Sequence, residues 1–550
     1  MKLATFRFPI AAAAAAASVA GSAVAAEILV TADIATSTTW TKNNTYNLQG
    51  QIYVLPGATL TIEAGTVIAS TTNLGGSLAV TRDARIVAIG TADEPIIFTS
   101  KADVATWTNG DPRTGTWRAA ANEWGNLTIC GRGYIGKYGN GAQSGNTAAP
   151  NANNVAVMEG LSSVAGQESR PLYGGGNDFD YSGVLKYCSF RYGGKVIGLG
   201  NELNGISLGG IGRETEIDYV EVMNNVDDGI EIWGGTVDLK HFQVWNIGDD
   251  SIDLDHGWRG RAQFGLIVSG YSVSASAGSG FPDNLFEIDG AAKSDAQPVT
   301  TCAFFNVTAI GQPETFNNRA ALTFADGARA QFNNSIIMDV GGRVVNNRNT
   351  DGEATDGQTG YGHNGTLGFA DLWTTNFNVT STVNPFSNPA ERYTAQAGGK
   401  LCQVTDTVFF NNPNSAAYTE ANSRGVFNAA NNNVLATARP VVLIERGTQV
   451  VNNQNAVVRN VTRLDPRPAA DAVTSVGTAP ANSFYTPAKY RGAFGANENW
   501  AYGWSAASAF GFLVAPPADG PTCPADLTND GVVDGIDLGQ LLGAWGDCGG

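Results

Sequence analysis

The sequence predicts an all-β protein, a right-handed parallel β-helix solenoid that ends in a small Ca²⁺-binding loop–helix unit. Three observations predict the solenoid. Similar short segments return every 22 to 26 residues, which is within the range of solenoid repeats. Apolar and polar residues alternate in these segments with the period of two that is typical of β-strands. No long amphipathic helix precedes the last thirty residues.

Composition narrows the class of protein. The chain has 550 residues, of which 43% are hydrophobic, enough to bury a core and to argue against global disorder. Acidic residues outnumber basic ones by 50 to 33, and the net charge is -17. Nucleic-acid binding needs basic patches, so we expect no nucleic-acid partner. The balance suits an exported protein that binds divalent cations.

The N-terminus has the features of a secretory signal peptide, residues 1–26. Lys2 and Arg7 supply the positive region, residues 11–20 form a small-residue apolar run, and residues 23–26 offer a cleavage site before Glu27. No later stretch has eighteen uninterrupted apolar residues, so we expect no transmembrane span after signal removal. The expected location is secreted or cell surface.

Cysteine usage agrees with export. The six cysteines are Cys130, Cys188, Cys302, Cys402, Cys523 and Cys548. None forms a CxxC pair, and the chain has only 3 histidines, so a zinc site is not expected. Cys523 and Cys548 bracket the last segment and are the best candidates for a disulfide. The other four are compatible with pairing or with burial as small apolar residues.

The repeated segments predict which strands stack on one another in successive coils. Residues 57–66 return loosely at 83–91, and residues 204–208 return more sharply at 228–232 and 250–254. About three strands per coil would fit this period, with equivalent apolar residues stacked inward. The stacked sets would be Ile206, Ile230, Ile252 and Leu208, Ile232, Leu254. A β-propeller is the alternative fold, but its blades usually need ~40–50 residues, and nothing repeats at that length.

The sequence also predicts three loops inserted between the coils, and a linker between the β-helix domain and the tail. The β-helix domain is expected over 27–514, with loops inserted at 101–123, 136–182 and 348–366, where Gly, Asn, Asp and Thr are frequent. Residues 515–522 have the composition of a linker, and the tail follows at 523–550.

Several segments resemble a broad family of exported bacterial proteins whose activity is undetermined. They are Trp124-Gly125-Asn126-Leu127, Tyr192-Gly193-Gly194, residues 201–205, residues 225–229 and Tyr490-Arg491-Gly492-Ala493-Phe494 with Trp500 and Trp504. The resemblance covers most of residues 50–510. It implies a pectate-lyase-like parallel β-helix and no particular reaction.

An acidic stripe at 227–255, with the adjoining His256, is the densest group of titratable residues. It consists of Asp227, Asp228, Glu231, Asp249, Asp250, Asp253, Asp255 and His256. If 22 residues make one coil, Asp228 lies beside Asp250 and Glu231 beside Asp253, about 4.8 Å apart. Carboxylates stacked so closely repel unless a cation, a proton or a hydrogen bond intervenes.

Glycoside hydrolysis is one explanation of the stripe, since paired carboxyl groups can act as acid and base. Residues 228–230 and 248–252 resemble two polygalacturonase signatures, which implies catalytic roles for Asp228, Asp249 and Asp250. The family's Gly-His-Gly and Arg-x-Lys motifs do not follow at the expected places. Candidate substrate contacts are Glu231, Asp253, His256, Arg259 and Arg261.

Two further explanations need no reaction. Oxygen ligands from adjacent turns could hold Ca²⁺. Alternatively, Asn204, Asp228 and Asp250 form a turn ladder that caps backbone N–H groups coil after coil, with Glu231 and Asp253 outward and solvated.

The tail contains a twelve-residue loop that fits a Ca²⁺ site, starting at Asp526. Its expected ligands are Asp526, Thr528, Asp530, the Val532 carbonyl, Asp534 and Asp537. Gly531 supplies the sharp turn. A helix should follow, with one apolar face made by Leu538, Leu541, Leu542 and Trp545.

The loop, its closing Asp537 and the following helix resemble a single dockerin repeat, and the flanking cysteines resemble a short dockerin-like tail of exported bacterial proteins. The resemblance implies anchoring to an envelope or cohesin-like partner. We therefore expect an exported cell-surface or extracellular β-helix protein with a binding or structural role. The alternative is a polysaccharide hydrolase or lyase that uses the acidic stripe, so enzymatic activity is left open.

Overall fold

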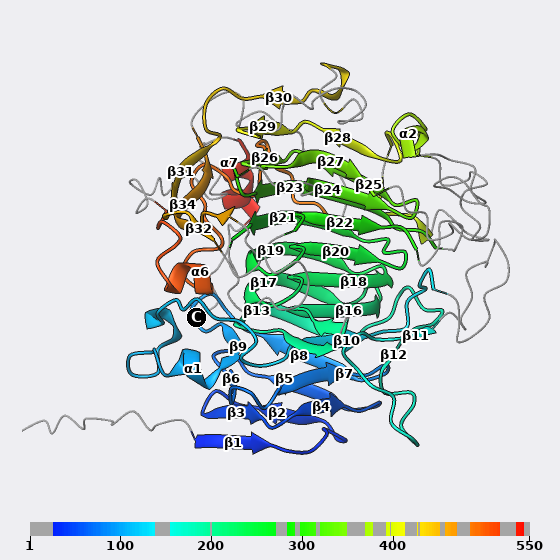
Figure 1. The fold of residues 1–550 in the computed structure, drawn as a ribbon, viewed down its shortest axis with the longest axis vertical. Coiled ribbons are helices and arrows are strands. Elements are labelled where there is room, and N and C mark those ends of the chain that lie inside the picture. The colour runs from blue at the N-terminus through cyan, green and yellow to red at the C-terminus, as the bar shows by residue number, and fades with distance from the viewer. Residues whose placement is uncertain are drawn as a thin grey trace, which may run out of the picture.

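The chain forms a parallel β-helix whose coils stack along the longest axis of the molecule (Figure 1). This is seen in a computed structural model. The described residues are 26–137, 155–198, 201–270, 283–291, 298–314, 320–348, 369–377, 392–396, 398–412, 426, 429–451, 457–469, 484–516 and 535–543.

Two parallel sheets carry the coils. The first sheet has 17 strands. They are β1 (Ala26–Val30), β2 (Thr38–Trp40), β3 (Asn44–Leu48), β5 (Thr59–Ile62), β6 (Val67–Ser70), β8 (Arg85–Ile89), β9 (Ile96–Ser100), β13 (Gly183–Arg191), β17 (Glu216–Asn225), β19 (Asp238–Ile247), β21 (Arg261–Val268), β23 (Thr301–Ile310), β25 (Arg329–Asn333), β26 (Ile336–Met338), β28 (Gln403–Thr405), β29 (Val408–Phe410) and β30 (Val434–Leu435).

The second sheet has 9 strands. They are β4 (Gln51–Val54), β7 (Ser77–Val80), β10 (Leu127–Cys130), β16 (Ile206–Ile211), β18 (Ile230–Gly235), β20 (Ile252–Asp255), β22 (Phe286–Asp289), β24 (Ala320–Ala325) and β27 (Arg343–Asn347).

The pairing register confirms the sequence repeats. Ile206 pairs with Ile230, which pairs with Ile252, so the offsets of 24 and then 22 residues each correspond to one coil. In the first sheet Leu60 pairs with Ile86. These side chains are almost completely buried, and each contributes about 1.5–3 kcal/mol by leaving water.

A column of rings marks one corner of the coils. Tyr187, Tyr219, His241 and Phe264 all have φ between 44° and 61°, and the ladder pairing skips them. Successive rings stack with centroids 4.3, 4.2 and 4.9 Å apart. The left-handed conformation costs roughly 1–2 kcal/mol at each position, and the stacking of aromatic rings offsets part of that cost.

The chain also forms antiparallel hairpins and short helices outside the two parallel sheets. The hairpin pairs are β11 (Val155–Val157) with β12 (Leu172–Gly174), β14 (Lys195–Gly198) with β15 (Asn201–Leu203), β31 (Val441–Arg446) with β34 (Val461–Pro468), and β32 (Val450–Val451) with β33 (Val457–Val458). The described helices are α1 (Lys101–Val104), η1 (Pro112–Thr114), α2 (Phe369–Leu372), η4 (Ala429–Asn431), α6 (Ala506–Ala509) and α7 (Gly535–Gly543). None of the described helices is both long and apolar enough to cross a membrane.

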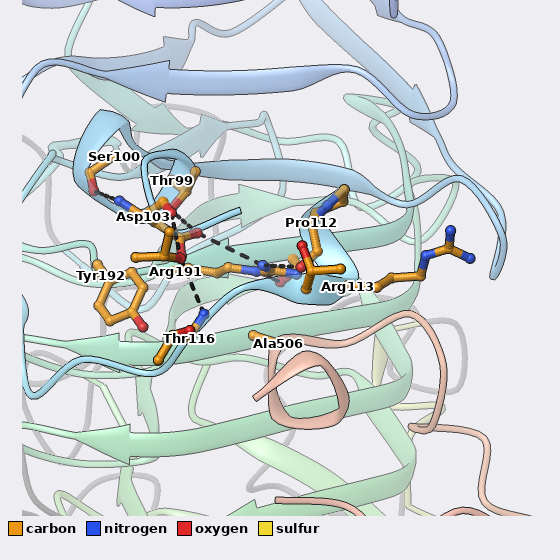
Figure 2. A network of polar contacts seen from close by, with 12 residues as sticks. Thr99, Ser100, Asp103, Pro112, Arg113, Thr116, Arg191, Tyr192 and Ala506 are labelled. Carbon is orange, nitrogen blue, oxygen red and sulfur yellow. Dashed lines mark hydrogen bonds and ion pairs between the residues drawn. The ribbon is translucent and has the colours of Figure 1, made fainter. Parts of the chain in front are cut away.

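The insertion at 101–123, expected to be a loop, contains α1 and η1 and is anchored by a buried polar network (Figure 2). Asp103 and Arg191 are 0% and 1% exposed, and their Oδ2 and Nη1 atoms lie 3.8 Å apart. Thr99 donates to Asp103 at 2.8 Å, and Ser100 caps α1 by accepting from the Asp103 N–H. Arg191 also reaches the Pro112 carbonyl at 3.5 Å, which ties η1 to the coil body.

The β-helix domain was expected over 27–514, and the last strand of the parallel sheets within the described residues is β30. After β30 at Leu435, β31 to β34 form antiparallel hairpins, and residues 484–516 pack on the outer face of the first sheet. The apolar contact includes Trp245, Trp500 and Trp504. A buried carboxylate, Glu221, fixes the start of α6 by accepting the N–H groups of Ala506 and Ala507 at 2.5 and 3.0 Å.

The four described cysteines are free and buried: Cys130, Cys188, Cys302 and Cys402. Cys302 pairs with Ala330 in the next coil, and the register of the following coil places Cys402 beyond Ala330, so an alanine separates these two thiols. Cys523 and Cys548 lie outside the described residues, as do most of the signal peptide and linker. Their disulfide stays a prediction.

Candidate functional site

The acidic residues gather on the outer face of the second sheet and in the turns that precede its strands. We call this group the acidic site. It comprises Glu159, Glu202, Asp227, Asp228, Glu231, Asp249, Asp250, Asp253, Asp255, Asp283 and Asp289. Figure 1 shows β18, β20 and β22 in successive coils above β10 and β16, and the β11–β12 hairpin beside those two strands.

A hydrogen-bonded ladder runs through the turns. Asn204 Oδ1 accepts the N–H of Asp228 at 3.2 Å, and Asp228 Oδ1 accepts the N–H of Asp250 at 2.9 Å. Asp250 accepts the N–H of Asn284, whose own Oδ1 accepts the N–H of Ala320 at 3.1 Å. Each side chain therefore satisfies a backbone donor one coil further on, and the expected turn ladder extends through Asn284.

A second column points outward from the strands. Ser207, Glu231, Asp253, Glu287 and Thr323 are paired from coil to coil. We expected Glu231 and Asp253 to be solvated, but Glu231 is only 5% exposed and Asp253 is half-buried. Glu231 accepts a hydrogen bond from the Asn204 amide, which stabilises it where solvent does not reach.

The β11–β12 hairpin and the segments around it explain this burial. Met158 and Tyr173 pack with Trp233 on the outer face of the second sheet. A Cβ on Gly209 would lie 2.3 Å from the Met158 Cε and 2.6 Å from the Tyr173 Cγ. The absence of a side chain at Gly209 therefore lets the hairpin lie close against the sheet, beside Glu231.

Burial changes the ionisation of the acidic site. Loss of solvation, with nearby carboxylates adding to it, raises the pKa of Asp227 to about 8 and that of Glu159 to about 7. The same causes raise the pKa values of Asp228, Glu231 and Asp253 well above their usual range. Loss of solvation is the largest cause for each of these carboxyls and neighbouring carboxylates add to it, so burial favours their protonated form.

Three overlapping trios bring carboxylate oxygens within 4.8 Å of one another. They are Asp227, Asp228 and Asp249; Asp228, Glu231 and Asp253; and Asp249, Asp250 and Asp283. Oxygen donors of this type are those that Ca²⁺ prefers. Stacking of adjacent parallel strands produces the same spacing.

The chain matches the family described as pectate-lyase like beta helix domain over residues 32–408, more than half of its length. It belongs to this family. No curated protein and no solved structure matches the chain.

Within this pectate-lyase-like β-helix, the matched region contains the whole acidic site and ends at β29, before the β31–β34 and β32–β33 hairpins and residues 484–516. The family thus accounts for the coils that position the site. The segment that covers the first sheet lies beyond the match.

His256 lies at the edge of the acidic site. The Tyr173 hydroxyl is 2.6 Å from its Nδ1, and the two rings are stacked with centroids 6.3 Å apart. Burial lowers the pKa of His256 to about 4, so the ring is neutral at neutral pH. His256 is therefore suited to a hydrogen bond with Tyr173 rather than to holding an anionic group.

The two candidate arginines are engaged elsewhere. Arg259 is 1% exposed and makes paired contacts of 2.7 and 2.8 Å with Asp178. Arg261 is paired with Asp238 and lies over the Phe484 ring at 4.6 Å. Both guanidiniums have carboxylate partners outside the acidic site, and the substrate contacts expected of them stay a prediction.

Of the tail, the described residues are those of α7, 535–543. Asp526, Thr528, Asp530, Val532 and Asp534 lie outside the described residues. Asp537, the expected closing ligand, lies in the first turn of α7 and is 2% exposed. The Ca²⁺ site of the tail stays a prediction.

Sequence reasoning missed four members of the acidic site: Glu159, Glu202, Asp283 and Asp289. A signal for the last two was present, because residues 283–289 repeat the pattern of 249–255. The intervening coil is longer, 34 residues between Asp253 and Glu287, which hid the repeat. Glu159 and Glu202 come from the added hairpins, and no repeat marks them.

Proposed function

We propose that the protein is an exported β-helix protein with a binding role, that the acidic site contacts a polysaccharide, and that the tail tethers the protein to an envelope partner. One observation favours binding over catalysis. Asp228 and Asp250, two of the three candidate catalytic residues, each use a carboxylate oxygen to cap a backbone N–H and are 7% and 4% exposed.

The chemistry of the acidic site supports a sugar ligand. Carboxyls that keep a proton can donate a hydrogen bond as well as accept one, whereas ionised carboxylates only accept. Asp249, Asp253 and Asp255 are only half-buried, so a hydroxyl-rich chain could reach this side of the cluster. Carboxyls that can both donate and accept on one face suit recognition of sugar hydroxyls.

The tail supports tethering. Leu538, Leu541 and Leu542 in α7 are 55%, 47% and 58% exposed, while Asp537 is buried. The helix thus directs an apolar face outward, which is typical of a docking surface. The proposed partner is an envelope or cohesin-like protein, with Ca²⁺ held by the loop that precedes α7.

Glycan-array binding tests the proposal on the full mature chain. We expect retention of at least one polysaccharide class without release of products. The Asp253→Asn, Asp255→Asn double variant should weaken binding by tenfold or more. The matched control is Asp111→Asn, because Asp111 lies in the inserted segment at η1 and pairs with Arg113. Equal binding by both variants would contradict the assignment of the acidic site.

A hydrolase is the second candidate, favoured by a different observation. Asp227 and Glu159 have pKa values of about 8 and 7, the range of a general acid that works at neutral pH. Release of reducing ends, abolished in Asp227→Asn or Glu159→Gln with binding retained, would favour this function. Binding without release in wild type favours the first.

A further inference from the structure

An unpaired arginine lies inside the body, away from the acidic site. Arg329 begins β25 and is 1% exposed. Its neighbours Ala328 and Ala330 face the core, so strand alternation directs Arg329 to the opposite face of the first sheet. Its Nε, Nη1 and Nη2 atoms are all buried, and none has a hydrogen-bond partner in the described structure.

Comparable arginines are satisfied. Arg259, also 1% exposed, is held by Asp178. Arg191, again 1% exposed, donates to the Ser189 hydroxyl at 2.9 Å and lies 3.8 Å from Asp103. A guanidinium removed from water without an acceptor is strongly disfavoured, and among the described arginines that are at most 2% exposed, Arg329 alone has all three nitrogens without a hydrogen-bond partner.

Among the described residues, no carboxylate is found to act on Arg329. The groups that act on it are the Tyr393 hydroxyl and the Cys402 thiol. Burial raises the pKa of each to about 12, so both are neutral at neutral pH. Tyr393 also interacts electrostatically with Arg259, whose charge is already balanced by Asp178. Within the described part of the chain, the Arg329 cation therefore has no counter-charge.

We propose that the Arg329 guanidinium binds a small oxyanion of the phosphate, sulfate or carboxylate class, enclosed beside Tyr393. The planar fork of an arginine presents parallel N–H groups that match two oxygens of such an anion. The near-complete burial of Arg329 limits the ligand to a small ion and excludes a polymer. The inference is independent of the proposed saccharide binding.

Thermal unfolding of the full mature chain provides the first test. We expect phosphate, sulfate or acetate to raise Tm saturably by a few degrees, relative to chloride at equal ionic strength. Arg329→Met should abolish this response. Arg191→Met is the matched control, since it removes an equally buried but partnered arginine, and should lower Tm while keeping the anion response.

Crystallography of the wild-type protein provides a second test, which does not require Arg329→Met to fold. Crystals of wild type grown with selenate should show an anomalous peak within hydrogen-bond distance of the Arg329 nitrogens. An absent peak together with no anion-dependent Tm in wild type would overturn the proposal. So would an anion response of unchanged size in a folded Arg329→Met variant.

Discussion

Asp250 shows how one side chain in this fold can serve structure rather than chemistry. Its carboxylate caps the Asn284 N–H, and its own N–H is capped by Asp228. We expect Asp250→Asn to keep the acceptor and the shape while relieving repulsion with Asp228. The free energy of unfolding should change by less than about 1 kcal/mol or rise, measured by urea denaturation.

Added Ca²⁺ distinguishes the turn ladder from a cation site that includes Asp250. Under the ladder interpretation, wild type and Asp250→Asn gain equal stability from Ca²⁺, because the tail is unchanged in both. A Ca²⁺-dependent rise in Tm that is larger in wild type would show that Asp250 ligates the ion.

The buried acids and His256 make stability depend on pH in opposite directions. The pKa values of Asp227 and Glu159 are raised in the folded state to about 8 and 7. Their contribution is complete below their unfolded pKa values and is lost as pH rises through the folded values. The pKa of His256 is lowered to about 4, so its contribution is present above about 6.5 and is lost as pH falls toward 4.

We therefore expect the ionisation of Asp227 to lower Tm as the pH rises from 5 to 8. Asp227→Asn should flatten this fall, because the variant cannot ionise. His256→Gln should instead reduce the loss of stability below about pH 6.5. A pH profile that neither substitution changes would contradict the burial of these groups.

At the scale of elements, the β11–β12 hairpin depends on a close approach at Gly209. Gly209→Ala would put a Cβ 2.3 Å from the Met158 Cε, and we expect a loss of about 1–3 kcal/mol. Hydrogen exchange should increase over 155–174. Gly198→Ala is the matched control, since nothing lies within 4 Å of its added Cβ, and it should leave stability nearly unchanged.

For the whole molecule, the C-terminal segment is held to the coils by a buried carboxylate. Glu221 accepts hydrogen bonds from Ser189 and Gln243 at 2.6 Å, besides the α6 amides. Glu221→Gln turns one acceptor into a donor that faces other donors, so we expect a loss of about 1–3 kcal/mol.

Limited proteolysis should then cut the 484–516 segment sooner than in wild type. The matched control is Glu216→Gln, a more exposed carboxylate of the same strand whose contact to Lys186 is 3.6 Å. If both variants are cut at the wild-type rate, Glu221 does not hold the segment.

The coil architecture and the ladder were determined by the sequence itself. The inward stack of Ile206, Ile230 and Ile252 follows from a short period and from strand alternation, which are local properties of the chain. The Asn204, Asp228 and Asp250 ladder follows from the same repeat. Asn284 was hidden because its coil is longer.

Burial and pairing were decided only by the tertiary structure. Glu231 is enclosed because a hairpin from a distant insertion covers it, and Arg259 is paired with Asp178, 81 residues away in the chain. The 484–516 segment covers the first sheet through contacts to strands some 280 residues earlier, such as Ala506 to Glu221 at a separation of 285. No local period encodes such contacts, because they depend on which surfaces the folded coils leave available for later segments to cover.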